Sequence, residues 1–391
     1  MLLDPSAAAA TLKLWLSTEV TGTLAANGAA QTFTTTRVGQ NARYTFAGTT
    51  GKPLSLVLSG DTFLGTTSVY VYQPNGSLLT QTSISAGNSA TLVDLTPPVT
   101  GTYTVLVTPE GTATGTLTTT LWADVSGTLT INGAATAASV PIGRDGRYTF
   151  TGTAGQGLGL GITDVVTTPA DNYVYVKVLK PDQTVLLDCN VIYHSVGGGR
   201  CNPLLLPASG VYTVLLEPSA AAATLKLWLS TEVTGTLAAN GAAQTFTTTR
   251  VGQNARYTFA GTTGKPLSLV LSGGTFPGTT SVYVYQPNGS LLTQTSLYYE
   301  SGAGSFTILS LDPPATGIYK VLMTPEGTAT GTLTTTLLAD VAGTVTLNGA
   351  ATVVSVPPGH DGRYTFTGTV GKVLSLSITD PVTVPPDGYI S

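Results

Sequence analysis

Apolar and polar residues alternate along most of the chain with the period of two that is typical of a β-strand facing a core. In residues 68–72 (SVYVY), this alternation places Val69 and Val71 on one face and tyrosines on the other. An Asn-Gly pair follows at residues 75–76, and this dipeptide between two such runs is a strong signal for a tight hairpin turn. No stretch shows a convincing helical period, so the pattern predicts an all-β chain.

The chain also repeats itself over long distances. Residues 5–83 recur as residues 218–296 with two differences. These differences are Asp61 against Gly274 and Leu64 against Pro277. The sequence Arg-Tyr-Thr-Phe marks this copy and three others, at residues 43–46, 147–150, 256–259 and 363–366. The period is therefore about 107 residues, and the copies alternate between two types, A and B.

A repeat of this length has the size of an independent domain and is too long for one turn of a solenoid. Short strands separated by turn residues predict an antiparallel β-sandwich or jelly roll in each copy. We therefore expect a tandem array of such domains in the order A-B-A-B. The predicted boundaries are residues 1–19 for the closing strands of a truncated B-type domain, 20–124 for an A-type domain, 125–232 for a B-type domain, 233–340 for an A-type domain and 341–391 for a truncated B-type domain.

Both ends of the sequence fall inside a repeat, since residues 2–5 correspond to residues 215–218 and residues 380–391 to residues 164–175. We expect the sequence to be a piece of a longer array. In an alternative, the first strands would complete the last half-domain of a neighbouring chain, head to tail. The two pieces would still lack the equivalent of residues 176–214, so monomeric beads on a string are the favoured prediction.

Charge is sparse and evenly divided, with 16 Lys and Arg against 20 Asp and Glu, together 9% of the residues. Without a basic patch, neither nucleic acid nor an anionic membrane surface is an expected partner. No apolar stretch approaches the roughly 20 residues that span a bilayer, so we expect no membrane insertion.

The two cysteines, Cys189 and Cys201, lie in a segment dense with Gly, Asn and Pro. This spacing suits a disulfide that closes a local loop, and a disulfide would place the protein in an oxidising, extracellular compartment. The alternative is a pair of free thiols on neighbouring strands.

Catalytic chemistry finds little support in the sequence. A hydrolase needs a nucleophile, a base and an orienting group held together, and the chain has only two histidines, His194 and His360, at unrelated places in their copies. We therefore expect no catalytic residues and no enzyme activity.

Two acidic residues of the B-type copies are the best candidates for a metal site. They are Asp164 and Asp171, repeated as Asp380 and Asp387. Two carboxylates with backbone carbonyls could hold calcium weakly, and no other cofactor is expected. Aspartates that open turns beside proline are the alternative interpretation.

Paired tyrosines are the candidates for ligand binding. Tyr70 and Tyr72 share one strand face, as do Tyr283 and Tyr285, and paired rings at this spacing could stack on sugar faces. Half-buried aromatic residues are also ordinary stabilisers of a sheet, which is the alternative. The arginine of Arg-Tyr-Thr-Phe is expected to pack its stem on the sheet and to leave its head in water.

The order of these features resembles the bacterial pre-peptidase C-terminal domain. The matching stretches are residues 69–79 with 98–107, and their counterparts 282–292 with 314–321. The resemblance implies a β-sandwich of the kind found on secreted peptidases and in large secreted or surface proteins, including some with RHS-type repeats. Members of the family serve as targeting, substrate-binding or spacer modules, some with calcium.

Together these observations predict a non-catalytic stalk or spacer segment of a long bacterial protein, located outside the cell or on its surface. The alternative function is an adhesin-like array whose domains bind extracellular glycan or a matrix polymer and multiply weak contacts by avidity.

Overall fold

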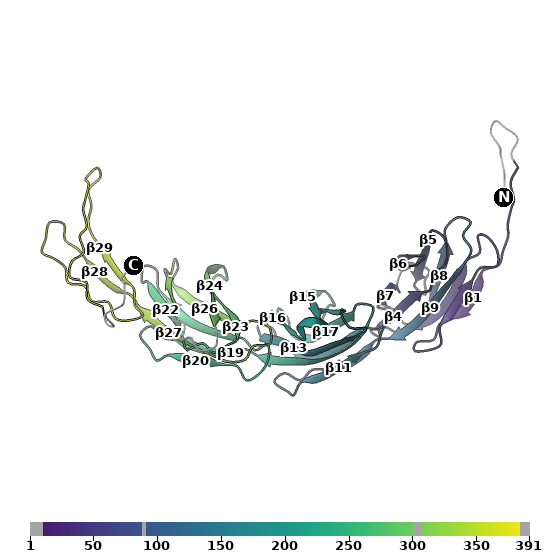
Figure 1. Ribbon diagram of the computed structural model, residues 1–391, viewed down its shortest axis with the longest axis horizontal. Helices are drawn as coiled ribbons and strands as arrows, with labels where there is room; N and C mark the ends of the chain where they lie inside the picture. Colours follow the sequence, from purple (N-terminus) through teal and green to yellow (C-terminus); the bar gives the residue numbers. More distant parts are fainter. Residues whose placement is uncertain (1–10, 88–90, 300–306, 384–391) are drawn as a thin grey trace.

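The computed structural model describes residues 11–87, 91–299 and 307–383, and these residues form an all-β chain, as the sequence predicts. One short 3₁₀ helix, His194–Val196, interrupts the strands, and the described ranges contain no α-helix. Within them, no helix has the length and apolar character needed to cross a membrane. The strands follow one another in groups that lie in a row along a curved path (Figure 1).

We call the first three groups of strands units 1, 2 and 3. Unit 1 contains β1 (Val20–Thr23), β2 (Gln31–Thr34), β3 (Ala42–Gly48), β4 (Leu54–Ser59), β5 (Thr66–Tyr72), β6 (Leu78–Ser85), β7 (Thr91–Leu95), β8 (Gly101–Pro109) and β9 (Thr116–Ala123). Unit 2 contains β10 (Val125–Thr128), β11 (Thr136–Val140), β12 (Gly146–Gly152), β13 (Gly157–Thr168), β14 (Tyr173–Leu179), β15 (Val185–Tyr193), β16 (Gly199–Leu205), β17 (Gly210–Pro218) and β18 (Ala222–Thr231). Unit 3 contains β19 (Val233–Leu237), β20 (Gln244–Thr247), β21 (Ala255–Gly261), β22 (Leu267–Ser272), β23 (Gly278–Tyr285), β24 (Leu291–Tyr299), β25 (Thr307–Leu311), β26 (Gly317–Pro325) and β27 (Thr332–Ala339). The strands β28 (Val341–Thr344) and β29 (Gly362–Thr365) follow it.

Each unit has a five-stranded and a four-stranded sheet with the same strand order. In unit 1 these orders are β1-β3-β8-β5-β6 and β2-β9-β4-β7. The prediction of wholly antiparallel sheets is wrong at one place, because the first strand of each unit pairs in parallel with the third, as Val20 opposite Ala42 illustrates. The strand between them lies in the other sheet, so the chain returns to the first sheet in its original direction.

Each unit has a core of its own. Within β5, Val69 and Val71 are buried, whereas Tyr70 and Tyr72 are only partly covered, as the alternation of the sequence predicts. The buried residues divide into three clusters, which lie within residues 24–121, 129–229 and 237–337. Each cluster draws side chains from both sheets of its unit, and no residue belongs to two clusters.

A buried tyrosine fixes the same corner in each unit. The hydroxyl groups of Tyr103, Tyr212 and Tyr319 donate hydrogen bonds to the backbone carbonyls of Val99, Ala208 and Ala315, at 2.7, 2.6 and 2.7 Å respectively. This local bond four residues back is the tyrosine-corner arrangement of antiparallel β-sandwiches, and it satisfies a hydroxyl group that the core would otherwise leave without a partner.

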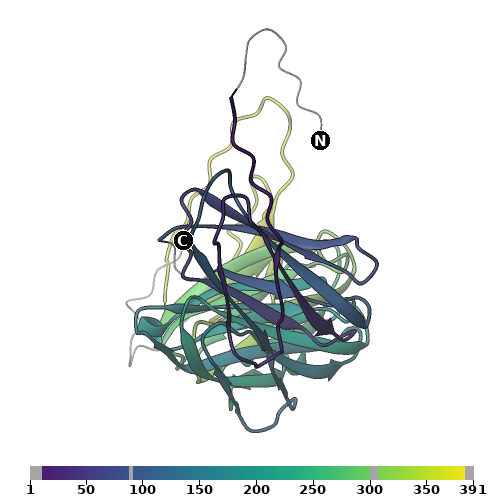
Figure 2. The same cartoon turned by 90° about the vertical axis from the view of Figure 1, so that its right-hand side faces the viewer.

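Residues 11–19 form no strand and project away from the sheets (Figure 2). The same sequence forms part of β18 in unit 2, where it pairs with β11 and β13. Leu16 is 96% exposed, whereas the corresponding Leu229 is 2% exposed. The closing strands predicted within residues 1–19 are therefore not formed by residues 11–19, because no described strand lies beside them; residues 1–10 lie outside the description.

Candidate functional site: the junctions between units

An ion pair recurs wherever one group of strands gives way to the next. At each junction an acidic residue directly after the closing strand accepts a hydrogen bond from the arginine of Arg-Tyr-Thr-Phe in the group that follows. Asp124 pairs with Arg147 at 2.7 Å, Glu232 with Arg256 at 2.6 Å and Asp340 with Arg363 at 2.7 Å. The sequence repeat therefore produces the same ion pair between successive groups three times.

The arginine head groups at the two inner junctions do not lie in open water, so that expectation is wrong. The side chains of Arg147 and Arg256 are 12% and 18% exposed, and the acids that they contact are 4% and 3% exposed. Burial of both charges weakens screening by water and salt, so each pair constrains the junction more than an exposed pair would. Glu19 and Arg43, at the start of unit 1, form the same pair in a much more exposed setting.

A second arginine of the following unit contacts a tryptophan of the closing strand at the first two junctions. The guanidinium carbon of Arg144 lies 4.3 Å from the ring centre of Trp122, and that of Arg250 lies 5.3 Å from Trp228. Arg250 also donates to the Ser230 hydroxyl at 2.7 Å and to the backbone carbonyl of Gly133. A cation over an indole face is attracted by the ring quadrupole. Each tryptophan therefore forms a stabilising contact with an arginine of the following unit.

Glycines allow the backbones of units 2 and 3 to touch directly. A Cβ atom on Gly161 would lie 2.5 Å from the carbonyl oxygen of Val251, and one on Gly252 would lie 2.5 Å from the backbone nitrogen of Gly161. Gly252 also has a φ of 74°, which disfavours a side chain at that position. This close approach makes the second junction a packed interface between the two units.

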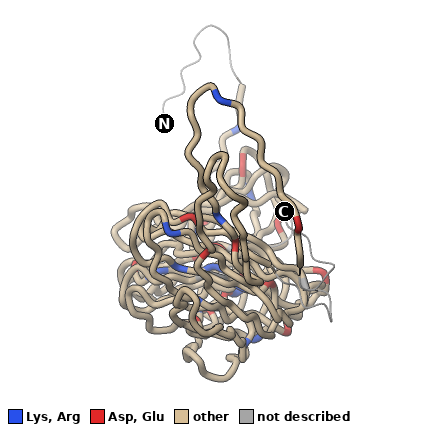
Figure 3. Tube along the Cα trace, turned by 90° about the vertical axis from the view of Figure 1, so that its left-hand side faces the viewer, with Lys and Arg blue, Asp and Glu red and all other residues tan. Residues whose placement is uncertain are grey.

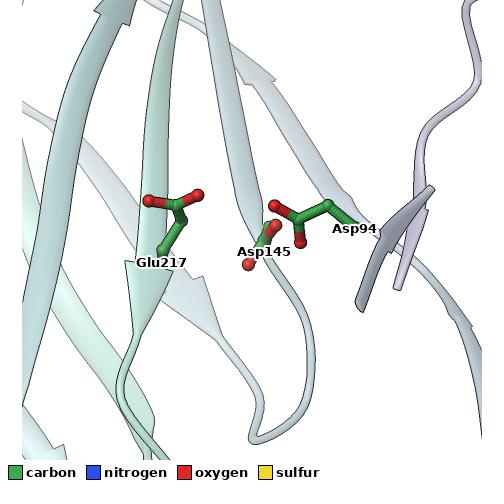
Figure 4. Close-up of side chains that lie close together, drawn as sticks. All are labelled: Asp94, Asp145 and Glu217. Atoms are coloured by element: carbon green, nitrogen blue, oxygen red, sulfur yellow. The ribbon is translucent and has the colours of Figure 1, made fainter. Parts of the chain in front are cut away.

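Three acidic side chains converge at the first junction. Asp94 from β7 of unit 1 meets Asp145 and Glu217 of unit 2, with one oxygen atom of each within 4.8 Å of the others (Figure 4). Asp145 is fully buried, and neither of its carboxylate oxygens has a hydrogen-bond partner. Glu217 accepts a hydrogen bond from Lys177 at 2.6 Å.

The pKa of Asp145 is raised to about 9, mainly by its burial and in addition by the negative charges of Asp94, Asp124 and Glu217. The spacing of these three acids along the sequence does not predict that they meet. Its members come from different units and are separated by long stretches of chain, so only the arrangement of the units in space brings them together.

The aspartates predicted as calcium ligands lie elsewhere. Asp164 is 60% exposed and pairs with Lys226 at 2.9 Å. Asp164, Asp171 and Asp380 all have positive φ values, of 55°, 66° and 54°, which aspartate tolerates better than most residues. Asp387 lies outside the described residues. In the part of the chain that the structure describes, none of these aspartates belongs to a group of three acidic, histidine or cysteine side chains that could hold a metal ion.

The predicted tyrosine pairs lie on the outer face of the five-stranded sheets. The rings of Tyr70 and Tyr72 stack with their centres 6.4 Å apart and their planes at 25°, and Tyr283 and Tyr285 do the same. Unit 2 has its edge-to-face contacts at the opposite end of the equivalent strand β14, where Tyr173 meets two other tyrosines. The arrangement presents paired aromatic faces at the surface of units 1 and 3.

Cys189 and Cys201 form a disulfide with their Cα atoms 5.0 Å apart. It joins β15 of the five-stranded sheet to β16 of the four-stranded sheet, so it links the edges of the two sheets of unit 2. His194, between the two cysteines, accepts a hydrogen bond at Nδ1 from the backbone nitrogen of Thr167 at 3.0 Å. The histidine thereby secures a turn against β13.

Comparison with known protein families gives one match within the strands of unit 1. Residues 40–109 match the family model of the bacterial pre-peptidase C-terminal domain. The chain therefore contains a domain of pre-peptidase C-terminal type. The matched residues cover β3 to β8. A search of curated proteins found no match.

Two solved structures are distant likenesses of this chain. One is the M60 catalytic domain with two CBM51 domains from Clostridium perfringens ZmpB, at 8% identity and a TM-score of 0.19, covering 76% of this chain and 34% of that one. Tripeptidyl peptidase 2 gives 11% identity and a TM-score of 0.18, covering 74% of this chain and 32% of that one. This chain thus spans about a third of the length of both proteins. TM-scores at this level carry no argument about fold or function.

Proposed function

We propose that this chain is a non-catalytic stalk or spacer segment of a bacterial protein that is secreted or displayed on the cell surface. In this proposal the units are tandem β-sandwich domains of pre-peptidase C-terminal type, arranged A-B-A-B. The observation that carries it is the repeated junction, in which a buried acid and arginine pair fixes each unit to the next. An ion pair that recurs at successive junctions would fix the orientation of each unit relative to the next, and with it the length and direction of the array.

The character of the surface supports the same proposal. Charged side chains are few, and Lys and Arg lie interspersed with Asp and Glu along the chain (Figure 3). Threonines cover many outward positions, including cross-strand pairs such as Thr32 with Thr118 and Thr245 with Thr334, both at 3.1 Å. Hydroxyl groups keep such a surface hydrated without ion pairs that salt would screen. The disulfide of unit 2 suits an oxidising location outside the cell.

Small-angle X-ray scattering of the chain tests the stalk. A compact protein of 391 residues would have a radius of gyration of about 21 Å. We expect a clearly larger radius and a pair-distance distribution with a long tail, at a mass that equals one chain by light scattering. A radius near that of the compact protein would contradict the proposal, and a mass that rises with concentration would favour head-to-tail assembly instead.

A second candidate function is glycan or matrix binding, and the stacked tyrosines on the outer faces of units 1 and 3 favour it. Co-sedimentation with insoluble polysaccharides is the direct assay. If binding occurs through these rings, a variant with Tyr70→Ala, Tyr72→Ala, Tyr283→Ala and Tyr285→Ala loses it, whereas the two-site variant of unit 1 alone keeps a weaker signal because avidity is reduced. Unchanged binding by the four-site variant would exclude the tyrosine pairs as the binding site.

A further inference from the structure

The most unusual group in the molecule is the carboxylate of Asp145. It is fully buried, both of its oxygens lack a hydrogen-bond donor, and Asp94 and Glu217 approach it (Figure 4). Burying a charged group without a partner is costly, and nearby charges of the same sign add to the cost. The site therefore needs something positive, and only a proton or a cation can supply it.

The junction between unit 3 and the strands β28 and β29 shows how the equivalent buried carboxylate is satisfied without a cation. There Asp361 stands in the place of Asp145, and Ser310 stands in the place of Asp94, opposite the same serine of the neighbouring strand. The Ser310 hydroxyl donates a hydrogen bond to the Asp361 carboxylate. Asp94 has no hydroxyl to donate when it is ionised, so the first junction replaces a hydrogen-bond donor by a second carboxylate.

The charge and spacing of the group suit a divalent cation. Three carboxylates carry three negative charges, and Lys177, which contacts Glu217, supplies one positive charge. The remaining acid nearby, Asp124, is already paired with Arg147. Two negative charges are thus left over, which equals the charge of one divalent ion.

The oxygen positions favour calcium among the divalent ions. Calcium binds oxygen at about 2.3–2.6 Å, so oxygens on opposite sides of one ion lie nearly 5 Å apart. One oxygen from each of Asp94, Asp145 and Glu217 falls within 4.8 Å of the others, which one ion can bridge. Asp94 is exposed, so water can reach the group and complete the six to eight ligands that calcium takes.

We propose that Asp94, Asp145 and Glu217 form a calcium site that links units 1 and 2. Asp94 belongs to unit 1 and the other two residues belong to unit 2, so the bound ion ties the two units together at their junction. This site differs from the aspartates that the sequence suggested, and it does not depend on the proposed stalk function. With ligands from only three side chains, we expect an affinity of roughly 10⁻⁴ to 10⁻³ M, as in extracellular calcium modules.

Isothermal titration calorimetry of the calcium-free chain with CaCl₂ near neutral pH tests the proposal. We expect one ion per chain, binding at least tenfold weaker in Asp94→Ser, and no binding in Asp145→Asn. The asparagine variant is expected to fold, because Asn41 and Asn254 occupy this position at the other units, and circular dichroism checks this. Asp164→Asn, an exposed aspartate away from the cluster, is the matched control and should bind as the parent does.

Two results would overturn the proposal. One is a folded parent chain that takes up no calcium at 10-fold above the expected range, on the order of 10⁻² M; a proton shared by Asp94 and Asp145 would then satisfy the site. The other is calcium binding that Asp145→Asn and Asp94→Ser leave unchanged, which would place the ion elsewhere. Scattering measurements of length are separate from this titration, so either proposal can fail alone.

Discussion

The first and second junctions use the same backbone plan with different side chains. The backbone nitrogen of Val125 donates to the carbonyl of Asp145 at 2.8 Å, and that of Val233 donates to the carbonyl of Asn254 at 2.9 Å. Both side chains are fully buried, but one is an acid and the other an amide. The fold therefore does not require a carboxylate here, and the acid of the first junction is an addition that must have its own compensation.

The junctions differ in their ion pairs as well. At the second, Glu232 receives two hydrogen bonds from Arg256, at 2.6 and 2.8 Å. At the first, Asp124 receives one from Arg147 and one from the Ser55 hydroxyl. The longer glutamate contacts the guanidinium group with both oxygens. The shorter aspartate accepts one hydrogen bond from each of the two units. The acid and the arginine are therefore joined by more hydrogen bonds at the second junction than at the first.

The largest expected effect comes from making the first junction resemble the second by Asp145→Asn. The raised pKa of about 9 means that the folded state holds a proton which the unfolded state releases near pH 4. Without calcium, the free energy of unfolding of the parent should therefore fall as pH rises from about 4 to about 9, by up to about 1.4 kcal/mol for each pH unit. Urea unfolding at a series of pH values should show this slope in the parent and lose it in the variant. If the free energy of unfolding depended on pH equally in the parent and the variant, the raised pKa could not be that of Asp145.

The next effect comes from breaking the ion pair of the second junction. Arg256→Ala leaves Glu232 buried without its partner, and we expect a loss of about 3 kcal/mol in the free energy of unfolding. Arg43→Ala removes the corresponding exposed pair at the start of unit 1 and should cost less than about 1 kcal/mol. Urea denaturation of both variants gives the comparison. Losses of equal size would show that burial at the junction contributes nothing.

A smaller difference should separate the two contacts between arginine and tryptophan. Arg144→Ala removes a cation over the Trp122 ring and should cost about 0.5–1 kcal/mol. Arg250→Ala removes the same contact with Trp228 together with hydrogen bonds to Ser230 and Gly133, so we expect about 2 kcal/mol. Tryptophan fluorescence during thermal unfolding follows both. A larger loss for Arg144→Ala would reverse the ranking of the two junctions.

The smallest effect tests the two A-type copies away from their junctions. Asp61 accepts a hydrogen bond from the backbone nitrogen of Phe63 at 2.9 Å, and unit 3 has Gly274 in its place. Unit 3 folds in the same way with glycine at this position. Asp61→Gly should therefore change the free energy of unfolding, measured by urea denaturation, by less than about 1 kcal/mol. A loss well above this value would mean that the copies are stabilised differently.

The sequence predicted what depends on neighbouring residues. Alternation placed Val69 in the core and Tyr70 outside, and the Asn-Gly turn at residues 75–76 joins β5 to β6 as expected. It did not predict the parallel pairing of β1 with β3, because that pairing depends on β2 leaving for the other sheet. Local pattern reveals which face of a strand is apolar, but it does not fix the neighbour of that strand.

The candidate site was harder to predict than the fold. The cluster around Asp145 needs Asp94 from one unit and Glu217 from the far end of the next, and no spacing in the sequence connects them. One signal was available, namely that the position two residues before the arginine of Arg-Tyr-Thr-Phe holds aspartate in the B-type copies and asparagine in the A-type copies. The repeat thus marked the position, but only the packing of two units revealed its neighbours.

Distance measurement across the first junction tests the central claim that the junctions hold successive units in a fixed relation. Spin labels at Lys52→Cys in unit 1 and Ala154→Cys in unit 2 occupy exposed positions on either side. Double electron–electron resonance should give one narrow distance distribution in the otherwise native chain and a broader one when Arg147→Ala is added. A broad distribution in the chain with its Arg147 intact would contradict the account.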